Sequence, residues 1–124
     1  MPDINWLGIY VLRAPDLVLG PYQGQPACVR IPLGRGVCGT AAEKQETLRV
    51  ENVHEFAGHI VCDPVSVAEI VVPLQLHGQL VGVLDIDSPV PSRFDENDQR
   101  GLELLCKTFL RHLEKHARGA ENFI

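Results

Sequence analysis

The sequence predicts an α+β fold in which helices pack on an antiparallel β-sheet. Apolar runs are joined by turn-forming residues, most clearly in Ile70–Leu76, His77-Gly78 and Gln79–Asp87, which is the pattern of a β-hairpin. A long amphipathic segment then follows Asp95. Hairpin strands with a helix appended are typical of a sheet with helices on its faces. With 124 residues, of which 45% are hydrophobic, the chain 1–124 is expected to form one domain.

Three strands are predicted in the first quarter of the chain. Trp6–Arg13 is rich in aromatic and branched residues at both odd and even positions, which predicts a strand buried on both faces. Ala14-Pro15-Asp16 has turn chemistry. A second strand is expected at Leu17–Tyr22 and a third at Cys28–Ile31, which Pro32 ends because proline cannot donate to the ladder.

The middle of the chain is expected to be less regular. Gly34–Gly39 reads as a glycine-rich turn that enters a short helix at Thr40–Glu43, and Leu48–Val50 as a short strand. His54–Val67 shows no convincing period and is expected to be a long loop with helical turns. Loops of that length are uncommon in compact domains and tend to be functional.

The last element is predicted to be an amphipathic α-helix. Asp95 is a good N-cap, with Asp98 three residues on. Acids at the start and cations towards the end match the helix dipole. The apolar residues at helical spacing are Leu102, Leu105, Phe109, Leu110 and Leu113. Cys106 lies beside this stripe and is expected to pack rather than react.

Charge and patterning exclude several classes of function. The net charge is -5, and lysines and arginines cluster only in the last helix, so neither a nucleic-acid footprint nor a membrane-binding patch is expected. No stretch has the composition of a signal peptide or of a membrane span. A cytoplasmic protein with a small-molecule partner is expected. In that compartment a set of cysteines indicates catalysis, redox sensing or metal binding more readily than a permanent disulfide framework.

Three cysteines, Cys28, Cys38 and Cys62, lie beside glycine, proline or charged residues. At such positions the backbone turns and a sulfur stays reachable, which favours redox chemistry. Two alternatives are three buried thiols and a zinc site that uses His54, His59 and Cys62. Zinc knuckles space their cysteines by two to four residues, whereas nine separate Cys28 from Cys38. No bound metal is therefore expected.

Acidic residues form a second candidate group. Asp85 and Asp87 are two residues apart in a predicted strand and so share a face, which begins with Val81 and Val83 and should be buried. Two carboxylates on a buried face raise one pKa or recruit a cation. Glu69, isolated among apolar residues, is a third acid for the same site. The alternative is a frayed strand end in which both aspartates are solvated.

The register of the hairpin decides whether these acids converge. A simple two-residue turn at His77-Gly78 pairs Ile70 with Asp85 and places Glu69 on the opposite face. Convergence requires one extra or one missing residue, which a three-residue loop or a bulge near Pro73 would supply.

Four stretches of the chain carry a resemblance to a known family. They are Asn5–Tyr10, Ala27–Gly39, Gly58–Leu74 and Gly82–Ser88 with the following Phe94-Asp95. In this combination the chain resembles the free methionine-(R)-sulfoxide reductases, a family of GAF-domain enzymes, from about Asn5 to Leu113. The resemblance implies a single GAF-like domain over 1–124. Members of the family usually carry a helical segment before the first strand, and this sequence, which starts a few residues before that strand, is expected to lack it.

The resemblance also implies roles for the cysteines. Cys62 corresponds to the thiolate that attacks free methionine-(R)-sulfoxide and becomes a sulfenic acid, and Cys28 to the resolving cysteine that condenses it to a disulfide. Cys38 is an alternative resolver. Thioredoxin is the implied reductant, so no bound cofactor is expected. Homodimerisation is a further expectation, since family members dimerise through terminal helices.

The acids fit this chemistry. Sulfoxide reduction needs a proton on the departing oxygen, and a carboxyl group with a raised pKa supplies it at neutral pH. Glu69, Asp85 and Asp87 match acids that line the family's substrate pocket, and the ionised ones suit the ammonium of a free amino acid. Trp6 and Tyr10 share a face of the first strand and are candidates to pack on the S-methyl group, or simply core residues. The competing hypothesis is a GAF module that senses a small molecule or an oxidant without turnover.

Overall fold

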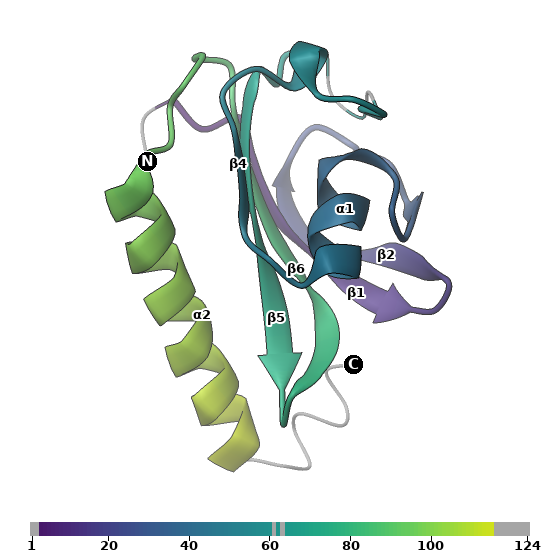
Figure 1. The fold of residues 1–124 in the computed structure, drawn as a ribbon, viewed down its shortest axis with the longest axis vertical. Coiled ribbons are helices and arrows are strands. Elements are labelled where there is room, and N and C mark those ends of the chain that lie inside the picture. The colour runs from purple at the N-terminus through teal and green to yellow at the C-terminus, as the bar shows by residue number, and fades with distance from the viewer. Residues whose placement is uncertain (1–2, 61, 63, 116–124) are drawn as a thin grey trace.

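The computed structural model describes residues 3–60, 62 and 64–115, and it has three layers (Figure 1). A curled six-stranded sheet lies between helix α1 on one face and helix α2 on the other. The sheet order is β3-β2-β1-β6-β5-β4, and all the paired strands are antiparallel. The elements are β1 (Trp6–Arg13), β2 (Asp16–Gly24), β3 (Arg30–Pro32), α1 (Gly36–Lys44), β4 (Leu48–Val50), the 3-10 turn Val53–Glu55, β5 (Ala68–Leu76), β6 (Gln79–Ser88) and α2 (Glu96–Lys115). The predicted α+β class is confirmed.

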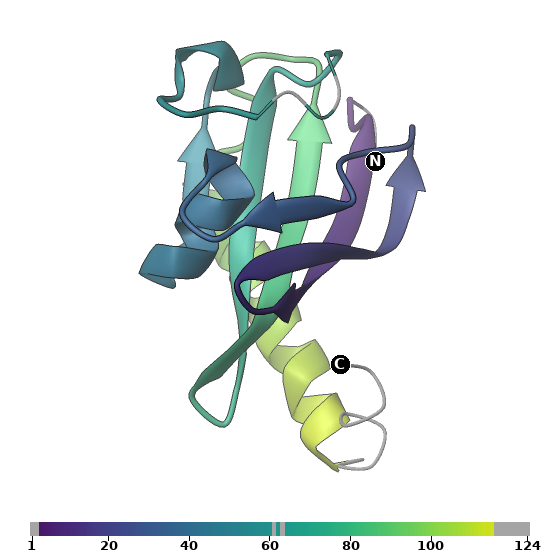
Figure 2. The ribbon, with the colours of Figure 1, turned by 90° about the vertical axis from the view of Figure 1, so that its right-hand side faces the viewer.

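Strands β2 and β3 differ in length from the prediction. β2 extends two residues past Tyr22, and β3 starts at Arg30, so Cys28 lies in the connection before it. Figure 2 shows β1, β2 and β3 side by side in the sheet. Helix α1, which follows β3 in the chain, packs on one face of the sheet.

One face of β1 is buried and the other is partly exposed. Trp6 and Tyr10 are 2% and 1% exposed, whereas Leu7 is 38% exposed. The prediction of burial on both faces was therefore wrong. The physical reason is that α2 packs chiefly on β5, so it covers the second face of β1 only in part: Ile9 packs with the cluster under α2, and Leu7 stays exposed.

Helix α1 begins at Gly36, earlier than the predicted Thr40. Gly34 and Gly36 adopt φ of 82° and 65° and complete the turn before the helix proper, a conformation that glycine tolerates best. Gly39 then lies against the carbonyl oxygen of Pro32, where a β-carbon would collide. As a consequence, Cys38 belongs to the first turn of a packed helix and not to an open turn.

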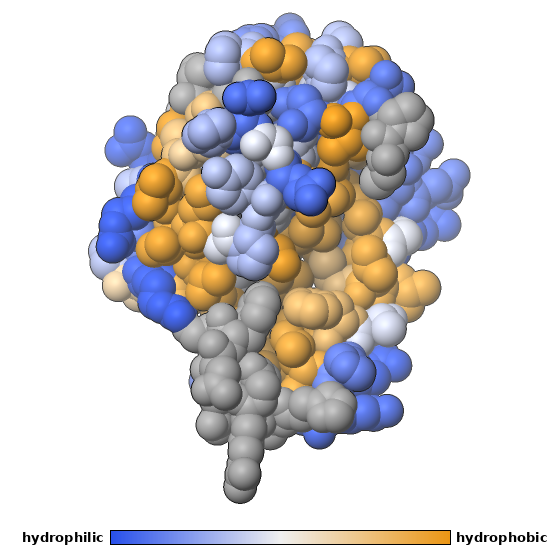
Figure 3. Space-filling view, turned by 180° about the vertical axis from the view of Figure 1, so that it is seen from behind, coloured by the Kyte–Doolittle hydropathy of each residue, from blue (hydrophilic) through white to orange (hydrophobic). Residues whose placement is uncertain are grey.

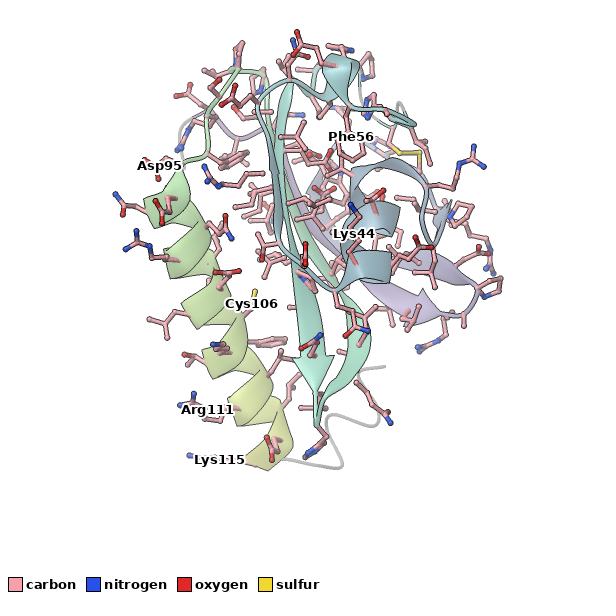
Figure 4. All side chains as sticks on the ribbon, viewed as in Figure 1. Lys44, Phe56, Asp95, Cys106, Arg111 and Lys115 are labelled. Atoms are coloured by element: carbon pink, nitrogen blue, oxygen red, sulfur yellow. A yellow bond between two sulfur atoms is a disulfide. The ribbon has the colours of Figure 1, made fainter. Side chains whose placement is uncertain are left out.

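Helix α2 is capped as the sequence predicts. The Asp98 amide donates to Asp95 Oδ1 at 2.8 Å, and the Asp95 amide donates to Asp98 Oδ2 at 2.9 Å. Cys106 is buried and points towards the sheet (Figure 4), which confirms its packing role. Leu105 and Phe109 are 60% and 37% exposed, so part of the apolar stripe of α2 does not pack against the sheet. Among the described helices none is long and apolar enough to cross a membrane.

A β-bulge sets the register between β5 and β6. His77 and Gly78 form the expected two-residue turn, with φ of 55° and 75°. Leu76 pairs with Gln79 and Gln75 with Leu80, but Leu74 pairs with Gly82. Val81 is therefore the extra residue, in the strand opposite the region of Pro73.

The bulge changes which side chains share a face. Beyond it Glu69 pairs with Asp87 and Val71 with Asp85, so all three acids point to the α1 side. Val81 packs with the cluster under α2, whereas Val83 packs with the cluster under α1. The expected convergence of the acids is confirmed. The expectation that Val81 shares their face was wrong, because the bulge inverts the alternation.

Candidate functional site

The predicted site residues surround one cavity on the α1 side of the sheet. The space inside it is about 40 Å³, enough for roughly one water molecule. Its walls come from β1, β3 and the connection before it, α1, β5, β6 and the loop before β5. The lining residues are Trp6, Tyr10, Ala27, Ile31, Gly36, Val37, Cys38, His59, Ile60, Cys62, Ser66, Glu69, Asp85 and Asp87. Of the eight predicted site residues, Cys28 alone is not in the wall, and it is bonded to Cys62.

The three acids form a buried cluster in this wall. Glu69, Asp85 and Asp87 are 7%, 5% and 7% exposed, so the alternative of a solvated strand end is wrong. Burial raises the pKa of Asp85 well above its usual range, and the neighbouring Asp87 and Glu69 raise it further. Asp85 therefore keeps its proton at pH values at which an isolated aspartic acid has lost it.

One oxygen of the cluster is available to a ligand. Asp85 Oδ1 is buried and accepts no hydrogen bond from the described residues. A buried polar atom of this kind is costly unless a partner joins it. The site is therefore built to receive a polar partner at Asp85: a donor if this oxygen is ionised, or an acceptor such as an oxygen atom if it carries the proton.

Trp6 and Tyr10 form an aromatic wall. The two rings stack at 5.9 Å between centroids, and Trp6 also stacks on Tyr22 at 5.7 Å. Both polar ends are bonded to the connection between β2 and β3: Trp6 Nε1 donates to the Gln25 carbonyl at 3.1 Å, and the Tyr10 hydroxyl donates to the Cys28 carbonyl at 2.9 Å. The aromatic pair thus offers an apolar surface and also ties down the segment that carries Cys28.

Cys28 and Cys62 form a disulfide in this structure (Figure 4), with their Cα atoms 5.2 Å apart. This is the pairing that the resemblance implies. The bond joins the connection after β2 to the loop before β5, and both cysteines are partly buried. Cys62 also lines the cavity, so its sulfur lies where a bound molecule would meet it.

Cys38 has a different environment from the other two. It is free, buried and 4% exposed, so the expectation that all three sulfurs are reachable was wrong for this one. Its Sγ donates to Glu69 Oε2 at 3.6 Å. Burial, followed by the charges of Asp85 and Glu69 and then Asp87, raises the pKa of the Cys38 thiol well above its usual range. Cys38 therefore stays a neutral thiol.

The zinc alternative does not match the geometry. His54 and His59 pack edge to face with ring centroids 6.1 Å apart, but the described residues do not bring them and Cys62 together as a ligand set. The reason is that the Cys62 sulfur is already bonded to Cys28. The group of metal-ligating type in the part of the chain that the structure describes is Cys38, Glu69 and Asp85, whose donor atoms lie within 4.8 Å of one another.

Sequence reasoning missed several wall residues. Ser66 is 6% exposed, and its hydroxyl accepts a hydrogen bond from Asn5 Nδ2 at 3.0 Å. His59, Ile60 and Val37 also line the cavity and were not among the predicted site residues. The available signal was the long segment His54–Val67, which was predicted to be functional but had no period from which individual residues could be chosen.

Comparison with known proteins adds to this geometry. A family model described as GAF domain matches residues 4–113. Protein YtsP of Bacillus subtilis (strain 168) is 53% identical over 115 residues, which are 91% of this chain and 71% of that protein. The free methionine-R-sulfoxide reductase of Escherichia coli (strain K12) is 56% identical over 105 residues, which are 85% of this chain and 64% of that protein. A structure of fRMsr of Staphylococcus aureus in complex with substrate has a TM-score of 0.86 at 50% identity, over 91% of this chain and 74% of that one.

Proposed function

The chain belongs to the GAF domain family, in the group that contains the free methionine-R-sulfoxide reductases, and on that premise we propose that it reduces free L-methionine-(R)-sulfoxide to L-methionine. The observation that carries the proposal is that Cys62 and three buried acids line one cavity. A thiol supplies the electrons, and an acid supplies the proton that sulfoxide reduction needs.

The proposed first step transfers the sulfoxide oxygen to Cys62. The reduced Cys62 sulfur attacks the sulfoxide sulfur and forms a sulfur–sulfur bond. The sulfoxide oxygen is protonated and moves to the Cys62 sulfur as its bond to the methionine sulfur breaks, and cleavage of the sulfur–sulfur bond releases methionine. The oxygen is retained on Cys62 as a sulfenic acid. Methionine sulfur is reduced by two electrons and Cys62 sulfur is oxidised by two.

The acids divide two tasks in this step. Asp85, whose pKa is raised by burial and by its acidic neighbours, is the proposed proton donor to the departing oxygen. Ionised carboxylates of the cluster bind the ammonium group of the amino acid. Trp6 and Tyr10 are the proposed contact for the S-methyl group, which an aromatic face suits well.

The second step resolves the sulfenic acid. The Cys28 thiol attacks Cys62, a sulfur–sulfur bond forms, and water leaves with the oxygen. The Cys28–Cys62 disulfide in the structure is the bond that this step would form. Thioredoxin is the proposed reductant: its dithiol is oxidised as the Cys28–Cys62 bond is reduced, so no bound cofactor is needed. This cycle suits the reducing cytoplasm.

A homodimer is the proposed assembly. Ile9, Leu84, Leu105 and Phe109 line an apolar groove between α2 and the sheet, and apolar residues gather over much of the rear face (Figure 3). Exposed apolar surface of this kind favours association. Sedimentation equilibrium tests this assembly. A monomer at every concentration would reject the dimer but would not contradict the proposed reaction.

The decisive experiment is a coupled assay of NADPH consumption with thioredoxin and thioredoxin reductase. Free (R)-sulfoxide should be reduced and free (S)-sulfoxide should not. An N-acetylated, amidated substrate should be poor, because it lacks the ammonium that the acids bind, and a site left with unpaired polar groups rejects such analogues strongly. Binding of free methionine sulfoxide without any methionine formed would favour a sensor instead.

A further inference from the structure

Cys38 is the cysteine that the proposed reaction leaves without a task. It lies outside the Cys28–Cys62 disulfide and is more deeply buried than either bonded cysteine. Helix α1 carries it, and α1 packs on β5 and β6, the strands of the acid cluster. Its side chain therefore belongs to the acid cluster and not to the loop that carries Cys62.

The contacts of Cys38 are with carboxyl oxygens. Its Sγ donates to Glu69 Oε2 at 3.6 Å. The ligating atoms of Cys38, Glu69 and Asp85 all lie within 4.8 Å of one another. A thiol is a weak donor, but inside a dry cluster a donor fixed at one oxygen decides which oxygens remain free to hold a proton.

The acidic proton of the cluster has candidate positions on Glu69, Asp85 and Asp87. Glu69 Oε2 accepts the Cys38 thiol hydrogen, and a donated hydrogen bond favours a carboxyl oxygen as an acceptor over the same oxygen as the site of the proton. Asp85 Oδ1 accepts no hydrogen bond from the described residues. The direction of the Asp85 pKa, raised by burial and by both neighbouring acids, agrees with a proton held there.

We propose that Cys38 is a positioning residue: its thiol holds Glu69 Oε2 as a hydrogen-bond acceptor, directs the acidic proton of the cluster to Asp85, and is not the resolving thiol. The proposal rests on the proposed reductase function. It assigns Cys38 to the first chemical step, reduction of the sulfoxide, whereas a resolver would act only in the second.

The groups that face Cys38 define the pH dependence to be measured. They are Tyr10 from β1, Glu69 from β5, and Asp85 and Asp87 from β6. All are acids, so removing the Cys38 thiol changes how protons are shared within the set. The pH profile of the first step should therefore move, which mere loss of packing would not cause.

The test compares Cys38→Ala, which removes the donor, with Cys38→Ser, which keeps one. Cys106→Ala is the matched control, since Cys106 is a buried free cysteine on α2 outside the cavity. Methionine formed in a single turnover is measured by rapid quench from about pH 5 to pH 9, beside thioredoxin-driven turnover and thermal denaturation. Cys38→Ala should slow the single-turnover step by about tenfold and shift its pH profile, as expected for loss of a group that orients an acid. Cys38→Ser should recover most of the rate, and both variants should still form the Cys28–Cys62 disulfide.

Three results would overturn the proposal. An unchanged single-turnover rate with slowed disulfide formation in Cys38→Ala would make Cys38 a resolver. Equal losses in Cys38→Ala and Cys38→Ser with an unmoved pH profile would make its role packing alone. Failure of the wild-type chain to form methionine would reject the proposed function and this proposal with it. A readout independent of activity is the infrared S–H stretching band that Cys38→Ser removes, which should shift in Glu69→Gln and would not shift if the hydrogen bond were absent.

Discussion

Glu69 on β5 lies directly opposite Asp87 on β6 in the buried part of the sheet. Like charges in cross-strand pairs destabilise a sheet, and burial increases the cost. The protein therefore carries a local conflict that a fold selected for stability alone would remove. Protonation of one carboxyl group or binding of a cation would reduce the repulsion. These two states correspond to the two proposed tasks of the acids, proton donation and binding of the substrate ammonium group.

Replacing an acid of the cluster should cost activity and not folding. Asp85→Asn and Asp87→Asn should each lower turnover of free methionine-(R)-sulfoxide by a factor of about 10² or more, because a positioned proton donor or its partner is removed. Both variants should be at least as stable as the wild type in a denaturant melt, since like-charge repulsion falls. The control is Asp16→Asn at the start of β2, outside the cavity, which should change neither. Full activity in either cluster variant would show that the acids are not part of the machinery.

Stability should fall as pH rises through the titration of the cluster. The folded-state pKa of Asp85 is raised above its unfolded value, so the folded protein binds more protons than the unfolded chain. The stabilisation is complete below the unfolded pKa of about 3.9 and is lost as pH rises towards the raised folded value. Urea melts across this range should show the decline, and Asp85→Asn should flatten it. The same slope in wild type and variant would place the titrating group elsewhere.

Substitution of Cys62 and of Cys28 should affect different steps of the reaction. Cys62→Ser should form no methionine. Cys28→Ser should form about one methionine per site in a single turnover and leave a sulfenic acid on Cys62 that a dimedone reagent traps. Cys106→Ser should behave as wild type in both steps. A full burst from Cys62→Ser, or a dimedone adduct on Cys38 in place of Cys62, would move the nucleophile to α1.

The bulge at Val81 should be essential for activity. Deleting Val81 restores an unbroken register between β5 and β6, which turns Glu69 away from the face of Asp85 and Asp87. Activity should drop below detection, and the free energy of unfolding should fall because one strand loses its match to the core. Val81→Ala keeps the residue count and should retain the site, with a stability loss of about 1 kcal/mol or less for a partly buried valine. Retained activity in the deletion would show that the acids do not need the shared face.

Local patterns in the sequence predicted most of the fold, and long-range packing explains the differences. β1, β4, the hairpin turn and the Asp95 cap could be read locally, because strand alternation and capping depend on neighbouring residues. The sequence predicted a bulge only as a condition for Glu69 to share a face with the two aspartates. Its position at Val81 could not be predicted, because no local residue pattern marks it. The early start of α1 depends on Gly39 lying against Pro32, a contact between segments whose approach no local period reveals.

The acids and cysteines of the site were identified from residue type and resemblance, but their environments required the structure. Cys28, Cys38 and Cys62 look alike in sequence, since each lies near a turn-forming or charged residue. The structure separates them by burial: two are partly exposed and bonded, and Cys38 is enclosed among carboxyl groups. Ser66 and Ile60 line the cavity through a loop whose path has no periodic signal.

The small volume of the cavity has a consequence for the order of events. With the Cys28–Cys62 bond formed, the interior has about 40 Å³ of space, roughly one water molecule and far less than an amino acid needs. In this disulfide form the cavity is therefore too small to enclose an amino acid. In the proposed cycle we expect substrate to bind after the disulfide has been reduced, and accumulated methionine to compete with substrate for the reduced form.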